Sequence, residues 1–249
     1  MVVFLHGGGW RVGSRRVFCP TWRDWRPEPF HRLVASGLAV ASVDYRLSGE
    51  AVFPGQLHDA KAAVRWLRVR AEELRVDAER IVAWGESAGA HPATLLGLTG
   101  DWAQLPDDTL QGQGPSSAVT GVVHWYSPTD LRALPSQALP SAVARSDAPD
   151  SRESLLLGAP LLEAPGLARR ASPITYVHRG APPFHIAHGA KDWFIPTAQS
   201  RQLNDALQAV GVDVEFAIIP NTDHRWIGAP DPEAIFTAAV DFVHRVTRA

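Results

Sequence analysis

Six short runs of apolar residues recur along the chain and are separated by segments with helical periodicity. The runs are Val2–His6, Leu38–Asp44, Ile81–Gly85, Gly121–Tyr126, Phe184–His188 and Val214–Ile219. Several are apolar without interruption, which is typical of parallel strands covered on both faces. Parallel strands joined through helices require right-handed crossovers. The pattern therefore predicts an α/β fold with a mostly parallel sheet of about six strands and helices on both faces.

The clearest helical periodicity runs from about Leu57 to Leu74. Its apolar positions follow at three- and four-residue steps and form one stripe: Leu57, Ala60, Val64, Leu67, Ala71 and Leu74. Two later segments have the same spacing, with apolar positions at Leu203, Ala206, Leu207 and Val210, and at Ile235, Ala239, Phe242 and Val246. We therefore expect one long helix before the third strand and two more near the carboxyl end.

The chain has 249 residues, without an internal repeat or a long low-complexity linker. This length suits one large α/β domain, and we expect residues 1–249 to form it. The stretch 131–172 differs from the rest, because it is rich in Pro, Ala, Ser and Arg and has no strand pattern. We interpret it as a partly helical, lid-like insertion above the carboxyl edge of the sheet.

Composition argues against several classes of function. The net charge is −2, and no run of Lys or Arg indicates a nucleic-acid surface. No stretch approaches the roughly 18–20 apolar residues of a membrane span. The first residues lack the basic region of a secretory signal. Cys19 is the single cysteine, so no intrachain disulfide can form. We expect a cytoplasmic protein that binds neither nucleic acid nor membrane.

Ser87 lies between two glycines in the sequence GESAG, directly after a predicted strand and before a helix. This is the setting of a nucleophile elbow, in which a strained turn presents the serine at the edge of the sheet. The helix that follows begins at the same point, and its dipole favours negative charge there. The alternative is an incidental serine in a glycine-rich turn. The strand–turn–helix setting favours the nucleophile.

The sequence HGGGW, residues 6–10, follows the first predicted strand. Successive glycines allow a backbone to approach a ligand closely. Acyl transfer needs N–H donors aimed at the developing oxyanion. We assign the predicted oxyanion hole to the amides of Gly8, Gly9 and Ala88. A phosphate-binding loop is the alternative, but no P-loop Lys-Ser/Thr follows and the spacing is not that of a dinucleotide fingerprint.

A serine nucleophile needs a histidine base that is oriented by a carboxylate. In an α/β-hydrolase sheet the chain order is serine, acid, histidine. Asp192 follows the fifth predicted strand and His224 follows the sixth, so both lie where this order requires. Asp130 is the second-choice acid, and Asp223 is poorly placed to hold the ring of its neighbour. His185 and His188 fall on the fifth strand, and we interpret them as structural.

Trp10, Trp193 and Trp226 flank these predicted site residues in the sequence. Their indole rings either line an acyl or aryl pocket or support the loops that carry the site. The sequence leaves both interpretations open.

Several motifs together match one family: "HGGGW", "DYRLS", "FPGQLHDAKAAVRWLR", "IVAWGESAGAH", "LLGLTGD", "WYSPTDL", "ASPITYV" and "HGAKDWFIP". Over nearly its whole length the chain resembles the feruloyl/acetylxylan-esterase-like (BD-FAE) branch of the α/β-hydrolases, near the hormone-sensitive-lipase-like esterases. The resemblance implies a serine esterase that cleaves small-molecule carboxylic esters, with Ser87 as nucleophile, Asp192 as acid and His224 as base. It implies no metal and no cofactor.

The chain departs from the family pattern in two ways, and two rival functions stay open. The first two strands of the family are missing here. Ala90 and Pro92 replace the usual Gly and Leu after the elbow, and a proline there is expected to kink the helix. The SAGAH spelling is shared with kynurenine formamidases, so an amide hydrolase is a rival function. A second rival is a non-catalytic ligand-binding protein of the same fold.

Without those two strands, the run Leu38–Asp44 becomes an edge of the sheet. Its sequence LAVASVD carries almost no charge. Such an edge invites pairing with other chains. We expect either that Met1 is a misplaced start and upstream residues cover the edge, which is the favoured interpretation, or that a homodimer covers it.

Overall fold

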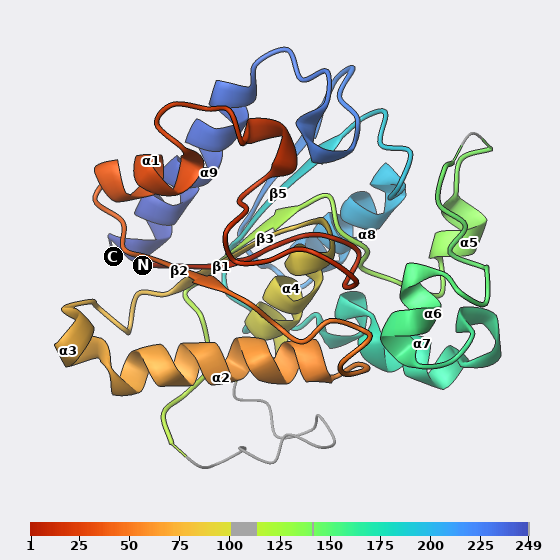
Figure 1. The fold of residues 1–249 in the computed structure, drawn as a ribbon, viewed down its shortest axis with the longest axis horizontal. Coiled ribbons are helices and arrows are strands. Elements are labelled where there is room, and N and C mark those ends of the chain that lie inside the picture. Colours follow the sequence, from red (N-terminus) through yellow and green to blue (C-terminus); the bar gives the residue numbers. More distant parts are fainter. Residues whose placement is uncertain (101–113, 141, 249) are drawn as a thin grey trace.

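The computed structural model describes residues 1–100, 114–140 and 142–248. In this part of the chain, six parallel strands form one sheet in the order β2-β1-β3-β4-β5-β6 (Figure 1). The strands are β1 (Val2–Leu5), β2 (Val40–Val43), β3 (Val82–Glu86), β4 (Gly121–Trp125), β5 (Phe184–Gly189) and β6 (Val214–Ile219). All six predicted strands are confirmed, and so is the α/β-hydrolase class of the fold.

Helices cover both faces of this sheet (Figure 1). The α-helices of the described residues are α1 (Pro29–Ala35), α2 (Gly55–Val69), α3 (Ala71–Leu74), α4 (Ala90–Thr99), α5 (Leu134–Gln137), α6 (Arg152–Leu157), α7 (Pro165–Ala171), α8 (Thr197–Ala209) and α9 (Pro232–Thr247). One apolar core lies between the sheet and α2, α4 and α8, and a second lies between the sheet and α1 and α9. The sheet is therefore buried on both sides, as its uninterrupted apolar runs predict.

The long helix predicted from Leu57 to Leu74 is interrupted. Helix α2 ends at Val69, and α3 follows after Arg70. Leu67 is buried, whereas Val69 and Leu74 are exposed. The apolar stripe thus loses contact with the core beyond Leu67. Beyond Leu67 there is therefore no packing against the core that would favour extending α2 along the same axis.

Helix α4 is not broken by Pro92. The helix begins at Ala90, so the proline lies in its first turn. The first four amides of a helix have no acceptor within it. The missing N–H of Pro92 therefore has no acceptor within α4, and the helix continues through the proline to Thr99.

Because the strands are parallel, their carboxyl ends share one edge of the sheet. The loops after β1, β3, β5 and β6 meet there and carry the HGGGW, GESAG, Asp192 and His224 segments. Helices α5, α6 and α7 lie beyond the same edge, at the right of Figure 1. They belong to the stretch 131–172, of which residue 141 is outside the described residues. A lid function of this stretch stays a prediction.

Strand β2 lies at one edge of the sheet, beside β1, as predicted. Its four residues are half-buried. The homodimer expected to cover this edge stays a prediction.

The close approach of α4 to the sheet depends on Gly97. A Cβ at this position would overlap the Val122 side chain, which is fully buried in β4. Gly166 in α7 is the matched case, because a Cβ there would have no neighbour within 4 Å.

We therefore predict that Gly97→Ala lowers the free energy of unfolding by about 1–3 kcal/mol through overpacking. Gly166→Ala should be neutral or stabilising, because it reduces the entropy of the unfolded chain. Both glycines lie in helices, so both variants gain helix propensity from alanine. The difference in unfolding free energy between the two variants therefore reports the contact with Val122. Urea unfolding of the two variants measures it. Equal stability of the two variants would contradict the packing of α4.

Candidate active site

Ser87 lies at the tip of a tight turn between β3 and α4. Its φ of 50° is in the left-handed region, which is strained for a non-glycine residue. A Cβ on Gly85 would overlap the backbone of Ala90, and one on Gly89 would overlap the carbonyl oxygen of Leu5 in β1. Both glycines of GESAG are thus required for the strand, turn and helix to approach one another. The geometry matches the predicted elbow.

A chain of hydrogen bonds joins Ser87, His224 and Asp192. Ser87 Oγ is 2.9 Å from His224 Nε2. His224 Nδ1 is 2.6 Å from Asp192 Oδ2. The Asp192 side chain is fully buried, and that of His224 is 7% exposed. Three residues far apart in the sequence therefore meet at the carboxyl edge of the sheet, in the predicted combination.

The Asp192 carboxylate is held from several sides. Its Oδ1 accepts hydrogen bonds from the amides of Phe194 and Ile195, each at 2.8 Å. Its Oδ2 is also 3.1 Å from His188 Nε2. Burial raises the pKa of this carboxyl, but the His224 ring and the hydrogen bonds from both histidines outweigh it and hold the pKa well below its usual range. Asp192 therefore stays ionised beside His224.

His188 in β5, which we interpreted as structural, contacts the carboxylate of Asp192 directly. Its Nε2 lies near two acceptors, Asp192 Oδ2 and the Ile195 carbonyl at 3.0 Å, so this nitrogen carries a proton. Its Nδ1 is 2.7 Å from Ser200 Oγ. His188 thus donates to the same carboxylate oxygen as His224. The sequence signal for this contact is the HGxxD spacing, which places His188 four residues before Asp192.

We expected Asp223 to be poorly placed to hold the ring of His224, and its carboxylate does not contact this ring in the described residues. Its Oδ1 accepts from the backbone amides of His224 at 2.6 Å and Trp193 at 3.1 Å. Asp223 therefore links the loop that carries the base to the loop that carries the acid.

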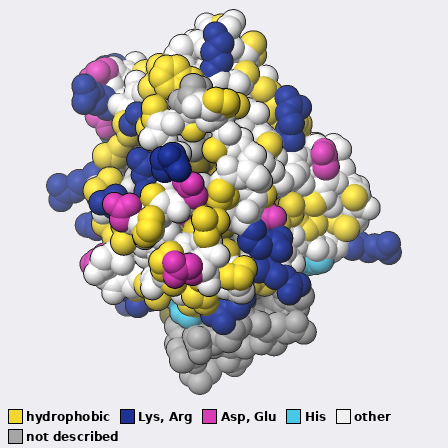
Figure 2. All heavy atoms as spheres, turned by 90° about the vertical axis from the view of Figure 1, so that its right-hand side faces the viewer, with side chains coloured by type: hydrophobic (Ala, Val, Ile, Leu, Met, Phe, Trp, Pro, Cys, Tyr) yellow, Lys and Arg dark blue, Asp and Glu magenta, His cyan; other side chains and the backbone are white. Residues whose placement is uncertain are grey.

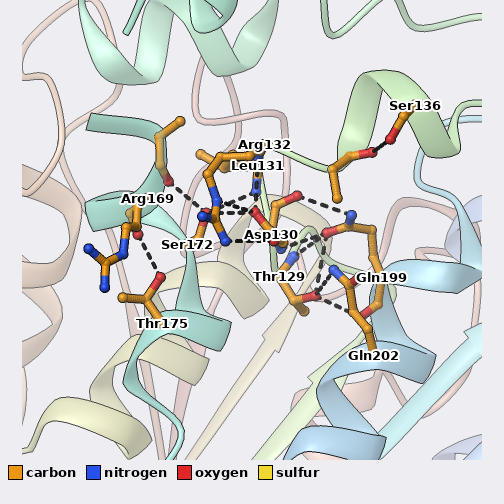
Figure 3. Close-up of polar contacts among 12 residues, drawn as sticks. Thr129, Asp130, Leu131, Arg132, Ser136, Arg169, Ser172, Thr175, Gln199 and Gln202 are labelled. Atoms are coloured by element: carbon orange, nitrogen blue, oxygen red, sulfur yellow. Dashed lines mark hydrogen bonds and ion pairs between the residues drawn. The ribbon is translucent and has the colours of Figure 1, made fainter. Parts of the chain in front are cut away.

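Asp130 belongs to a separate polar cluster (Figure 3). Its carboxylate pairs with Arg132 at 3.0 Å, and its amide donates to Gln199 Oε1 at 2.8 Å. Gln199 Oε1 also accepts from the Thr129 amide, and Ser172 Oγ accepts from the Leu131 amide. This cluster fixes the loop after β4 to α8 and to the end of α7. Its carboxylate has no contact with His224 within the described residues, so the structure gives no support to Asp130 as the acid.

The HGGGW loop is attached to the elbow through Glu86. The Gly7 amide donates to Glu86 Oε1 at 2.8 Å, and the Tyr126 hydroxyl donates to Oε2 at 2.9 Å. Burial raises the pKa of this carboxyl.

Gly8 and Gly9 of the same loop have φ of 120° and 63°, a region that favours glycine. Their amides donate to no acceptor within the described residues. Glu86 is a residue whose role the sequence did not reveal.

A cavity of about 720 Å³ opens over these groups. Ser87, Ala88, His224 and the HGGGW loop line it. The described residues therefore bring the predicted hydroxyl, imidazole and backbone amides to one solvent-accessible hollow.

The three tryptophans have different positions. Trp10 lines the cavity and packs edge-on against His91. Trp226 does not line it. Its backbone φ of 65° turns the indole ring into the core. The centroid of this ring lies 5.1 Å from that of Trp125 and 4.7 Å from that of Tyr126. Trp193 is 48% exposed and lies outside the lining too. Of the three, Trp10 borders the cavity over Ser87, whereas Trp193 and Trp226 do not.

Two further side chains border the site. Phe194 lies with its ring 5.2 Å from the His224 ring, and the Arg152 guanidinium lies 5.2 Å from the Phe194 ring. Arg152 comes from α6, in a stretch without a recognisable motif. Nothing in the sequence around it points to the site.

Within the described ranges, no three His, Cys, Asp or Glu side chains come together in a way that could hold a metal ion. In the same ranges, no helix combines the length and the apolar character that crossing a membrane requires.

Known proteins share this sequence and fold. Esterases LipQ and LipC of Mycobacterium tuberculosis are 30% and 31% identical over 91% and 90% of this chain. The chain spans 50% and 52% of their lengths. A truncated carbohydrate esterase from gut microbiota has a TM-score of 0.82 at 26% identity, over 100% of this chain and 86% of that one.

Butyrate-bound esterase 2 of Thermogutta terrifontis has a TM-score of 0.72 at 26% identity, covering 98% of this chain and 82% of its own. The family model BD-FAE matches residues 1–207. The chain therefore belongs to the BD-FAE family of α/β-hydrolases.

Proposed function

We propose that this protein is a serine hydrolase that cleaves carboxylic esters of small molecules through an acyl-enzyme. The single observation that carries the proposal is the hydrogen-bonded chain from Asp192 through His224 to Ser87, which ends in a cavity. A serine hydroxyl becomes a strong nucleophile when such a base takes its proton. The names of the esterase relatives agree with this chemistry.

In the first half of the reaction, Ser87 Oγ attacks the ester carbonyl carbon while His224 Nε2 takes the hydroxyl proton. Asp192 stabilises the imidazolium that forms. When the tetrahedral intermediate collapses, the bond to the alcohol oxygen breaks and His224 gives its proton to the leaving alcohol. The product is an ester between the substrate's acyl group and Ser87.

In the second half, a water molecule replaces the alcohol. His224 takes a proton from the water, whose oxygen attacks the acyl carbon. The carboxylic acid leaves when Ser87 Oγ recovers the proton from His224. The same three side chains therefore serve both halves.

The amides of Gly8, Gly9 and Ala88 are the proposed oxyanion hole. Each preorganised donor contributes about 3–4 kcal/mol to transition-state stabilisation in related chemistry. Two observations support the assignment: all three residues line the cavity, and the Gly8 and Gly9 amides have no acceptor within the described residues. The Gly7 amide is excluded because it is bonded to Glu86.

A binding protein would not require this proton-transfer chain, so catalysis is favoured over a receptor. An amide hydrolase would use the same residues and differ in the leaving group. Turnover of a 4-nitrophenyl ester and of the matching anilide distinguishes the three functions. We expect release from the ester, with a burst when deacylation is slow. A receptor gives no release, and an amidase prefers the anilide.

Ser87→Ala should abolish ester hydrolysis, because the nucleophilic oxygen is lost. The fold should stay intact, because the only hydrogen bond of this hydroxyl within the described residues is the one to His224. A fluorophosphonate probe should label the wild type at Ser87 and leave the variant unlabelled. Circular dichroism and thermal melting control for folding. Residual kcat above a few per cent of the wild type, with contamination excluded, would overturn the nucleophile assignment.

Asp192→Asn should lower kcat by about 10⁴-fold, because an amide stabilises the wrong tautomer of His224. Asp130→Asn is the matched control, since its carboxylate pairs with Arg132. It should have a far smaller effect. Steady-state kinetics of both purified variants give the ranking, and the reverse ranking would transfer the acid role to Asp130.

The rate should fall at acid pH through a single proton. His224 must be neutral to act as a base, whereas the lowered pKa of Asp192 keeps that carboxyl ionised through the same range. The acidic limb of log kcat/KM against pH should therefore have a slope of about one. A profile that is flat from about pH 5 to 8 would argue against a histidine base.

A further inference from the structure

The cavity over Ser87 is bordered by more positive than negative side chains. Its lining contains four arginines, Arg11, Arg23, Arg152 and Arg225, and two carboxyls, Glu86 and Glu153. Even with both carboxyls ionised, the arginines outnumber them. A site for a neutral ester has no need for such an excess.

Arg152 is the arginine whose position relative to the site is best defined. A Cβ on Gly9 would lie 2.9 Å from Arg152 Nε, so this side chain crosses the HGGGW loop. Its guanidinium lies 5.2 Å from the Phe194 ring, which is itself 5.2 Å from the His224 ring. Arg152 therefore brings a fixed positive charge from α6 to the edge of the reaction centre.

Arg11, Arg152 and Arg225 are not bound directly to a carboxylate in the described residues, although Arg152 lies near Glu153 and Arg225 near Glu86. None of the three side chains forms an ion pair or a hydrogen bond to a carboxylate within residues 1–100, 114–140 and 142–248. The Arg225 Nε is also buried without a hydrogen-bond partner in these residues. A buried donor without a partner is costly unless a ligand satisfies it.

The two carboxyls of the lining do not cancel these charges. Both oxygens of Glu86 are engaged by Gly7 and Tyr126. Glu153 is only 6% exposed, and burial raises the pKa of its carboxyl. With four arginines against two carboxyls, the lining keeps an excess of positive side chains. Figure 2, seen from the side of α5–α7, shows basic and acidic side chains scattered among hydrophobic ones on this face.

We propose that the substrate is an ester that carries a carboxylate, and that Arg152 and Arg11 recognise this group at the mouth of the cavity. The inference rests on the proposed ester hydrolysis and adds the substrate class. A guanidinium presents several N–H donors in a fixed fork that matches a carboxylate. A neutral ester would leave these donors without an anionic partner.

Matched pairs of esters test the proposal on either side of the scissile bond. For the acyl side, mono-4-nitrophenyl glutarate is compared with 4-nitrophenyl methyl glutarate. For the alcohol side, 4-acetoxybenzoate is compared with 4-acetoxybenzamide. The measured quantity is the ratio of kcat/KM for the anionic ester to that for its neutral partner. We expect the wild-type ratio to exceed one in at least one pair and to fall with added salt.

Arg152→Gln and Arg11→Gln should each lower that ratio by about tenfold, mainly through KM, as expected for a lost charge-assisted hydrogen bond. Two separate variants keep the test valid should one of them fold poorly. Arg169→Gln is the matched control, because Arg169 lies exposed in α7 of the same stretch and does not line the cavity. It should leave the ratio unchanged.

The outcomes separate this inference from the proposed function. Hydrolysis of the neutral esters that depends on Ser87, with ratios below one in both pairs or ratios unaffected by both arginine variants, would overturn the carboxylate proposal alone. Absence of hydrolysis for all four esters, or hydrolysis retained in Ser87→Ala, would overturn the proposed function.

Discussion

The site depends on one backbone contact, the packing of Gly89 against the carboxyl end of β1. The absence of a side chain lets the start of α4 touch the carbonyl groups of Leu5 and His6. The same contact brings the turn that carries Ser87 beside the HGGGW loop. Glu86 then connects the two segments through the Gly7 amide. A larger residue at position 89 would separate hydroxyl and loop whatever the rest of the fold did.

The sheet was predictable because burial on both faces leaves a strong mark on a sequence. Each of the six apolar runs contains a strand. The position of β2 at the edge followed from the family resemblance, whereas the full order of the six strands was not predicted. The break between α2 and α3 was missed, because helical periodicity continues past Leu67 although the core does not. Periodicity reports which residues lie on one face of a helix, and it does not report where the neighbouring layer ends.

The three residues of the hydrogen-bonded chain were predictable from the order in which parallel strands deliver loops to one edge. Side-chain direction within those loops was not. Trp226 turns into the core because left-handed backbone at Arg225 and Trp226 reverses the chain there, and neither residue type signals that conformation. Arg152 reaches the site through tertiary packing of α6 over the HGGGW loop. A contact between segments so far apart leaves no local pattern in the sequence.

Helix α6 comes from a different part of the chain than the groups of the proposed reaction. The groups of the proposed reaction lie on loops that continue from β1, β3, β5 and β6, whereas Arg152 belongs to the single connection between β4 and β5. The two ends of that connection are bound to each other and to α8 by the Asp130, Gln199 and Ser172 cluster, which has no contact with Ser87 or His224 in the described residues. The same connection also contacts the loop that carries Asp192, because the Val143 amide donates to the Trp193 carbonyl and Arg152 lies against the Phe194 ring. The residue proposed to recognise the substrate and the groups proposed to react with it therefore come from different segments that support each other at one point, beside His224.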